Sequence, residues 1–156
     1  MKTRMSKVVK GNVVDALLNK EVDVIAHVVN CQGVMGSGVA KEIKERVPQV
    51  FNAYSDIPGY RLGGFLYVNG VFNLFAQDSY GRDKRHLNYG ALAQSLSCME
   101  SELSDMRLDK GRTSPAWKIG IPYKMGCDRA GGDWEVVQEM LEHLLKDEAE
   151  IIYYKL

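Results

Sequence analysis

The sequence has few cysteines, no long apolar run and no excess charge of either sign. Its three cysteines lack C-x-x-C spacing, so neither a disulfide framework nor a zinc knuckle is expected. The three histidines are scattered, and we expect no metal and no cofactor. No apolar run is long enough to cross a bilayer, and no apolar signal core follows the basic residues 1–7. The expectation is a cytoplasmic protein without membrane contact.

Charge balance bears on the choice of partner. Lys and Arg number 20, as do Asp and Glu, so the formal net charge is zero. Non-specific nucleic-acid binding usually leaves a basic excess, so nucleic acid is not an expected partner. An anionic ligand would instead be held by backbone N–H groups and helix ends.

Length and composition fit an ordinary globular domain. The chain has 156 residues, of which 46% are hydrophobic and 26% charged, as is average for such proteins. A chain of this size buries enough surface to fold without disulfides. We therefore treat residues 1–156 as a single domain and expect a monomer.

Strand and helix patterns alternate along the chain. Residues 22–29 are almost continuously apolar and β-branched, which indicates a strand buried on both faces. Asn69-Gly70 between two apolar runs predicts a hairpin. Further strands are expected at 7–10, 117–121 and 150–154, and helices at 13–18, from 39 to Pro48, 48–54, 87–106 and 134–146. This order predicts an α/β fold, a three-layer α/β/α sandwich with a mixed central sheet.

Two glycine-rich loops each leave an apolar strand and enter a helix. The first spans residues 30–38 and the second residues 125–132. Glycines let backbone N–H groups approach an oxyanion, and the following helix adds its own unpaired N–H groups. The first loop lacks both the G-x-G-x-x-G register and the phosphate-loop lysine. In the second, Asp133 also has a simpler explanation as a helix N-cap.

In their order along the chain, these motifs resemble the macrodomain family. No single piece is specific, but the ordered set covers nearly the whole chain. The similarity is greatest to the branch of ADP-ribose-1''-phosphate phosphatases and small ADP-ribosyl hydrolases, whose second strand carries His at the position of His27. The motifs are Gly11-Asn12-Val13, 24–33 running into 35–40, 72–77 followed by Tyr80-Gly81, 87–89, Ile121-Pro122 running into Gly126-Cys127 and Trp134, and 154–156.

The resemblance implies a ligand and the residues that hold it. The ligand would be ADP-ribose or ADP-ribose 1''-phosphate, or an ADP-ribosylated macromolecule. Asn12 stands where macrodomains usually have an Asp that accepts the adenine amino group, and its carbonyl could accept the same bond. The distal ribose would contact Asn30 and Tyr80, and Tyr154 would stack on or edge the adenine. The remaining implied ligand-binding residues are Val13, Met35, Gly36, Ser37, Gly38, Val39, Met125, Gly126, Cys127, Asp128, Arg129, Ala130, Gly131 and Gly132.

The catalytic candidates are His27, Asn30 and Asp128. A histidine can serve as acid or base near neutral pH, although an imidazole in an apolar strand is more often a satisfied core residue. Two departures from the hydrolase branch matter. Gln77 stands where that branch attacks the ribose with a Lys, and Ala130 stands where it has an Asp, for which Asp128 or Asp133 could substitute.

Other reactive side chains have simpler interpretations. Cys31 and Cys127 lie in the glycine loops, where they are expected to be packing residues, because a nucleophilic thiol needs a lowered pKa and a base. His86, beside Lys84 and Arg85, is expected in a solvated loop, with contact to a phosphate as the alternative.

Three functions remain open at this point. The first is a metal-independent phosphatase of ADP-ribose 1''-phosphate or a hydrolase of a related ester, such as ADP-ribosyl-protein or O-acetyl-ADP-ribose. The second is a reader that binds ADP-ribose or ADP-ribosylated protein without turnover. The third, RNA binding, is disfavoured by the zero net charge and by the lack of an aromatic and basic stripe.

Overall fold

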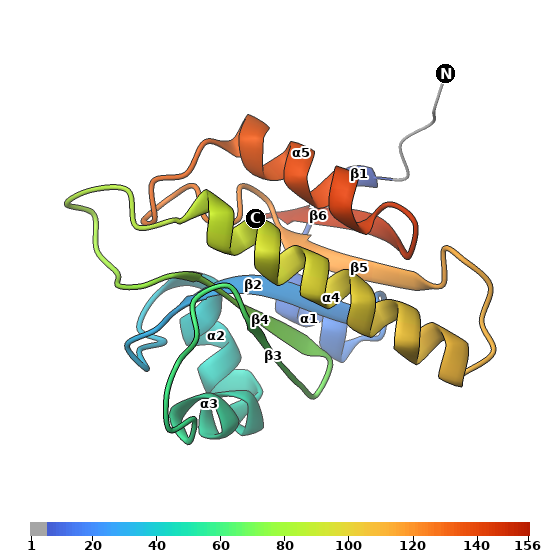
Figure 1. The fold of residues 1–156 in the computed structure, drawn as a ribbon, viewed down its shortest axis with the longest axis horizontal. Helices are drawn as coiled ribbons and strands as arrows, with labels where there is room; N and C mark the ends of the chain where they lie inside the picture. Colours follow the sequence, from blue (N-terminus) through green and yellow to red (C-terminus); the bar gives the residue numbers. More distant parts are fainter. Residues whose placement is uncertain (1–5) are drawn as a thin grey trace.

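The computed structural model describes residues 6–156, which form a mixed six-stranded sheet with helices on both faces (Figure 1). The strand order is β1-β6-β5-β2-β4-β3. Only the β3–β4 pair is antiparallel, and the other neighbours are parallel. The elements are β1 (Ser6–Lys10), α1 (Val13–Leu18), β2 (Val24–Asn30), α2 (Gly38–Arg46), α3 (Pro48–Ser55), β3 (Phe65–Val68), β4 (Val71–Gln77), α4 (Tyr89–Asp109), β5 (Trp117–Pro122), α5 (Trp134–Leu145) and β6 (Ala149–Lys155).

The sheet separates two hydrophobic cores, so the predicted α/β/α sandwich is confirmed. Helices α4 and α5 cover one face, and α1, α2 and α3 cover the other (Figure 1). Strand β2 supplies both cores, because its side chains alternate between the faces. Val24 and Ala26 face α4 and α5, whereas Ile25 and Val29 face α1 to α3.

The β3–β4 hairpin turns at Asn69-Gly70, as predicted. Both residues have positive φ, 49° for Asn69 and 81° for Gly70. Two positive φ values in succession are those of a type I′ turn, whose twist matches that of the flanking strands. The hairpin places β3 at the edge of the sheet, next to β4.

Helix α4 begins two residues later than the apolar stripe predicts. Asn88 is its N-cap and accepts a hydrogen bond from the Ala91 amide at 2.9 Å. Leu87 instead forms an isolated antiparallel bridge with Gln77. The predicted buried stripe, Leu92, Leu96, Met99 and Leu103, is present and fully buried. Within residues 6–156, no helix is long and apolar enough to span a membrane.

Candidate functional site

The glycine-rich loops meet at the carboxyl edge of the sheet. Loop 31–37 follows β2, loop 78–88 follows β4, and loop 123–133 follows β5. All three gather at the left of Figure 1. Because β2 is hydrogen-bonded between β5 and β4, the three loops leave adjacent strands. Ligands of open α/β sheets bind at this edge, so we place the candidate site here.

Asn30 shapes the first loop from within. Its side-chain oxygen accepts hydrogen bonds from the Gln32 amide at 2.9 Å and the Val34 amide at 3.3 Å, and its Nδ2 donates to the Val34 carbonyl at 2.8 Å. The buried Tyr54 hydroxyl lies 2.7 Å from the Asn30 carbonyl and 2.9 Å from its side-chain oxygen. Asn30 itself is buried. It therefore holds the loop in shape, and its predicted contact with a ribose stays a prediction.

The start of α2 presents unpaired backbone donors. Ser37 occupies the N-cap position but makes no capping hydrogen bond with its side chain. Within residues 6–156, the amides of residues 36–40 have no hydrogen-bond acceptor. A Cβ built on Gly38 would meet nothing within 4 Å, so the space above these amides is open. Unpaired N–H groups and the positive end of a helix dipole favour a bound anion.

The second loop is folded tightly on itself. The Gly132 amide donates to the Gly126 carbonyl at 2.9 Å and the Cys127 amide to the Lys124 carbonyl at 2.9 Å. A Cβ on Gly132 would lie 2.4 Å from Leu87 Cδ2 and 2.8 Å from the Gly126 carbonyl oxygen. The amides of residue 126 and residues 128–130 have no acceptor within residues 6–156. This loop therefore offers a second set of donors to an anion.

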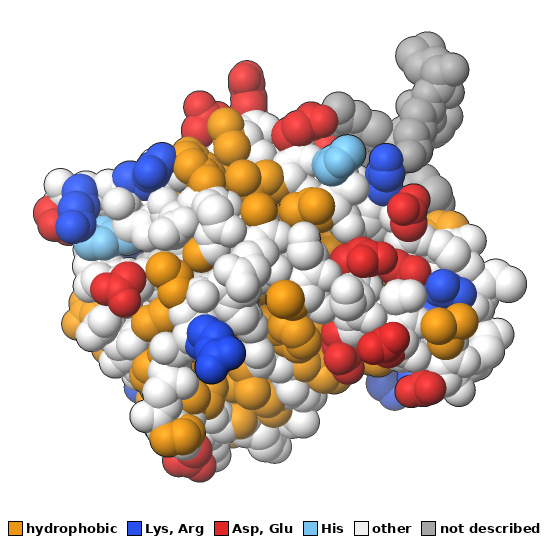
Figure 2. All heavy atoms as spheres, in the orientation of Figure 1, with side chains coloured by type: hydrophobic (Ala, Val, Ile, Leu, Met, Phe, Trp, Pro, Cys, Tyr) orange, Lys and Arg blue, Asp and Glu red, His pale blue; other side chains and the backbone are white. Residues whose placement is uncertain are grey.

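Loop 78–88 joins the two glycine loops. The Asp78 carbonyl accepts the Cys31 amide at 3.1 Å, and the Ala130 carbonyl accepts the His86 amide at 2.9 Å. Arg82 of this loop and Asp128 of the second glycine-rich loop form an exposed ion pair at 3.6 Å. His86 is not solvated as predicted: only 6% of its side chain is exposed, and its Nε2 lies 2.7 Å from Asp83. In Figure 2, which has the orientation of Figure 1, basic, acidic and histidine side chains lie together at the left end, where these loops are.

At the end of β1, Asn12 caps α1, with Val13 buried behind it. The Tyr154 ring packs close to Gly11 and Gly120, and its hydroxyl lies 3.5 Å from Glu21. Only 8% of Tyr154 is exposed. It is therefore mainly a core residue, and its predicted contact with a base is untested.

His27 lies inside the sheet rather than at its edge. It faces the α1–α3 side, 3% exposed, with its Nε2 2.6 Å from Asn73 Oδ1. Because Asn73 Nδ2 donates to the Leu66 carbonyl, its Oδ1 faces the imidazole and Nε2 carries the proton. Burial lowers the pKa of His27 to about 4, against the opposing effect of the Asn73 hydrogen bond. This placement favours the interpretation of a satisfied core histidine.

Replacing His27 with glutamine is expected to flatten the pH dependence of stability. The pKa falls from 6.5 in the unfolded chain to about 4 in the folded one. Between these values the unfolded state binds more protons, so stability is lost as the pH falls. At 1.36 kcal/mol per pKa unit the full loss is roughly 3 kcal/mol, of which about 2 kcal/mol falls between about pH 7 and about pH 4.5. Urea unfolding at about pH 7 and about pH 4.5 measures it; an equal loss in wild type and His27→Gln would contradict the assignment.

The remaining predicted residues occupy the site in different ways. Asp128, Arg129 and Tyr80 are exposed at its rim, whereas Ala130 and Met125 are buried beneath it. Gln77 pairs with Asn30 across β4 and β2, and its Nε2 donates to the Ser79 carbonyl.

The two loop cysteines are protonated near neutral pH. Burial raises the pKa of the Cys31 thiol, and it raises the pKa of the Cys127 thiol to about 11. Neither is therefore a thiolate under ordinary conditions, in keeping with the packing role expected from the sequence.

Three residues of this region were missed from the sequence. Tyr54 fixes Asn30, His86 anchors loop 78–88, and Glu42 of α2 receives the Asn12 side chain at 2.9 and 3.0 Å. Glu42 lies three residues after Val39 and so on the same helix face, which is the signal that could have found it. The other two contacts carry no local sequence signal.

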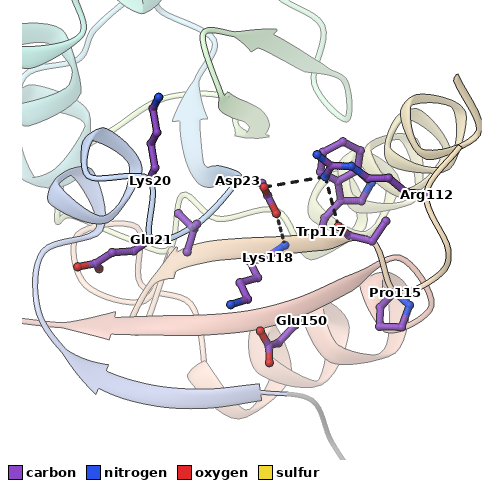
Figure 3. A pocket seen from close by; sticks show the side chains of 10 residues that line it. Lys20, Glu21, Asp23, Arg112, Pro115, Trp117, Lys118 and Glu150 are labelled. Carbon is purple, nitrogen blue, oxygen red and sulfur yellow. Dashed lines mark hydrogen bonds and ion pairs between the residues drawn. The ribbon is translucent and has the colours of Figure 1, made fainter. Parts of the chain in front are cut away.

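A hollow of about 480 Å³ lies at the opposite, amino-terminal edge of the strands (Figure 3). Asp23 accepts the Lys118 amide at 2.8 Å and lies 3.9 Å from Arg112, whose guanidinium covers the Trp117 ring at 4.5 Å. Its central charges are thus paired with one another. None of the predicted site residues lines it, and within residues 6–156 no three His, Cys, Asp or Glu side chains gather as a metal site.

Solved structures share this architecture. The macrodomain of Thermus aquaticus DarG superposes with a TM-score of 0.72 at 20% identity, covering 96% of each chain. Thermosipho africanus DarTG in complex with ADP-ribose superposes with a TM-score of 0.70 at 17% identity, covering 99% of this chain and 42% of that one. The chain has a macrodomain-like fold. At these identities, the likeness concerns the fold alone.

Sequence comparison adds a short local similarity to this macrodomain-like fold. No protein-family model matches the chain. A segment of 38 residues is 45% identical to the DNA ADP-ribosyl glycohydrolases of Mycobacterium tuberculosis and Mycobacterium bovis. It covers 24% of this chain and 11% of each relative, so most of the length of those proteins has no counterpart in the match.

Proposed function

We propose that this protein binds ADP-ribose derivatives at the carboxyl edge of the sheet and hydrolyses ADP-ribose 1''-phosphate to ADP-ribose and phosphate. The observation that carries the proposal is the pair of open donor sets, at residues 36–40 and around residues 126–130. Two such sets on adjacent loops can hold the two phosphates of a diphosphate through backbone N–H groups. Because the donors are backbone N–H groups, such a site needs no cluster of basic side chains, which agrees with the zero net charge of the chain.

The proposed reaction fits the polar groups at the rim. Gln77 occupies the position of the lysine used by the hydrolase branch, so a covalent ribosyl-lysine intermediate is not part of the proposal. Hydrolysis of a phosphate ester can proceed by attack of a water molecule on phosphorus, which breaks the bond from phosphorus to the ribose 1''-oxygen. That oxygen takes up the proton lost by the water, so ADP-ribose and inorganic phosphate are released. Asp128 is an exposed carboxylate of the second loop, whereas Asp133 caps α5. Asp128 is therefore suited to accept a proton from that water, and Arg82, 3.6 Å away, can stabilise charge on the phosphate oxygens.

A second candidate is release of ADP-ribose from a modified macromolecule. The local similarity to DNA ADP-ribosyl glycohydrolases and the DarG-like fold favour it. Here the bond cleaved would join the distal ribose to its acceptor, and the same loops would hold the diphosphate. Incubation with an ADP-ribosylated oligonucleotide and measurement of free ADP-ribose tests this candidate directly.

The test of the first proposal combines turnover with binding. We expect wild type to release phosphate from ADP-ribose 1''-phosphate and to bind ADP-ribose in calorimetry. Asp128→Asn should still bind but lose turnover by at least about 100-fold, the lower end of the range for a lost proton-transfer group. Asp105→Asn, an exposed change on α4, is the matched control. Binding without phosphate release would leave a reader or a hydrolase of another ester, and absence of binding would contradict the proposal altogether.

A further inference from the structure

The side-chain amide of Asn12 has a fixed orientation. Its Oδ1 accepts the Val14 amide at 2.8 Å and the Asp15 amide at 3.0 Å, while its Nδ2 donates to the Glu42 carboxylate. Backbone donors on one side and a carboxylate on the other exclude the flipped amide, which would pair like with like. The carbonyl of Asn12 is thus engaged by the helix cap, and its predicted contact with the amino group of a base stays a prediction.

Glu42 is the acceptor that remains beside Asn12. Its Oε2 lies 2.7 Å from Arg46 Nη1, and both of its oxygens lie within 3.0 Å of Asn12 Nδ2. Arg46 is itself held 2.7 Å from Asp15. A carboxylate has about four acceptor positions, so these contacts leave Glu42 able to accept a further bond. With 29% of its side chain exposed, Glu42 is held in place and yet reachable.

Glu42 also lies at a suitable distance from the anion-binding end of α2. It follows Gly38 by four residues, about 6 Å along the helix axis at 1.5 Å per residue. It shares a helix face with Val39, which the resemblance to macrodomains implies as a ligand-binding residue. In a nucleoside diphosphate the base is one ribose away from the nearer phosphate. A phosphate at the start of α2 therefore leaves the base within reach of Glu42.

We propose that Glu42 determines base specificity by accepting a hydrogen bond from the exocyclic amino group of a purine. This rests on the proposed binding of ADP-ribose derivatives. The selected class is a nucleoside diphosphate whose base carries a donor at this position, as adenine does. Hypoxanthine carries an oxygen there, which the carboxylate repels. Asn12 and Arg46 are positioning residues that hold Glu42 in place.

The experiment compares ADP-ribose with its deaminated analogue, inosine diphosphate ribose, by calorimetry. Wild type should prefer ADP-ribose by about 10-fold or more, as is usual for one hydrogen bond to a charged group. In Glu42→Gln the preference should fall to within about 3-fold, because a rotating amide can accept from the amino group or donate to the oxygen. Glu45→Gln, an exposed carboxylate on the same helix, should keep the wild-type preference.

The outcomes separate this inference from the proposed function. If wild type binds ADP-ribose and Glu42→Gln keeps the full preference, the role of Glu42 is overturned while ADP-ribose binding stands. If Asn12→Ala loses the preference while Glu42→Gln keeps it, base reading returns to Asn12, and the inference is equally overturned. If wild type binds neither nucleotide, both proposals fail together.

Discussion

Gly132→Ala is expected to reduce the affinity for ADP-ribose by about 100-fold, the equivalent of roughly 2.7 kcal/mol. An added Cβ would lie 2.8 Å from the Gly126 carbonyl oxygen, to which the Gly132 amide donates. A backbone carbonyl cannot rotate out of the way as a flexible side chain can. The added Cβ must therefore push residues 126 and 132 apart. Overpacking of this kind costs about 1–3 kcal/mol, and here the strain falls on the donor set around residues 126–130.

The lack of free space around the added Cβ makes this prediction specific to position 132. The other contact is with Leu87, 1% exposed and packed in the α4–α5 core, so its side chain has little room to turn away. Gly59→Ala is the matched control, because a Cβ there would meet nothing within 4 Å and its φ is not positive. Calorimetry with ADP-ribose compares the variants, and circular dichroism checks that each folds. Unchanged binding by a folded Gly132→Ala would mean that the second loop does not hold the ligand.

The fold was predictable because hydrophobic periodicity determines which face of each element is buried. The 24–29 run is buried on both sides of the sheet, and the stripe of α4 packs as its spacing indicates. What periodicity could not give is the start of α4. Leu87 continues the apolar pattern, but its backbone is bridged to Gln77, and Asn88 supplies the cap. That bridge depends on loop 78–88 returning beside β4, which no local pattern records.

Local backbone features could be predicted from the sequence, whereas the contacts of single side chains could not. The two glycine-rich turns between a strand and a helix could be predicted, because glycine adopts backbone conformations that other residues rarely take. The direction of a side chain could not, since it depends on partners distant in sequence. His27 is turned to Asn73, 46 residues away, and the Asn12 amide is oriented by Glu42, 30 residues away. In both cases the residue type indicated which hydrogen bonds the side chain can make. The tertiary contact determined which of its atoms are already hydrogen-bonded within the protein.

Asn30→Ala is expected to abolish measurable ADP-ribose binding and to lower the free energy of unfolding by about 2–4 kcal/mol. The substitution removes the acceptor of the Gln32 and Val34 amides and leaves Tyr54 with one partner fewer. A buried polar group left unsatisfied costs about 1–3 kcal/mol, and several share this one side chain. The loop then keeps the bonds from the Cys31 amide and Gln32 Nε2 to the Asp78 carbonyl, which lie at its start, before residues 33–37 lead into α2. Urea unfolding and calorimetry measure the two effects, with Asn52→Ala on the exposed face of α3 as control.

Asn30→Asp separates the effect of a changed loop conformation from the effect of an added negative charge beside the loop. A carboxylate keeps the acceptor oxygen, so Gln32, Val34 and Tyr54 retain their partner, whereas its second oxygen replaces the Nδ2 donor and faces the Val34 carbonyl without a hydrogen bond. Most of the stability should therefore remain. Affinity should still fall by about 10-fold or more, because the new negative charge stands behind the amides that receive a phosphate. If Asn30→Asp bound ADP-ribose as wild type does, the anion would have to lie elsewhere than at the start of α2. If Asn30→Ala were as stable as wild type, the first loop would owe its shape to other contacts.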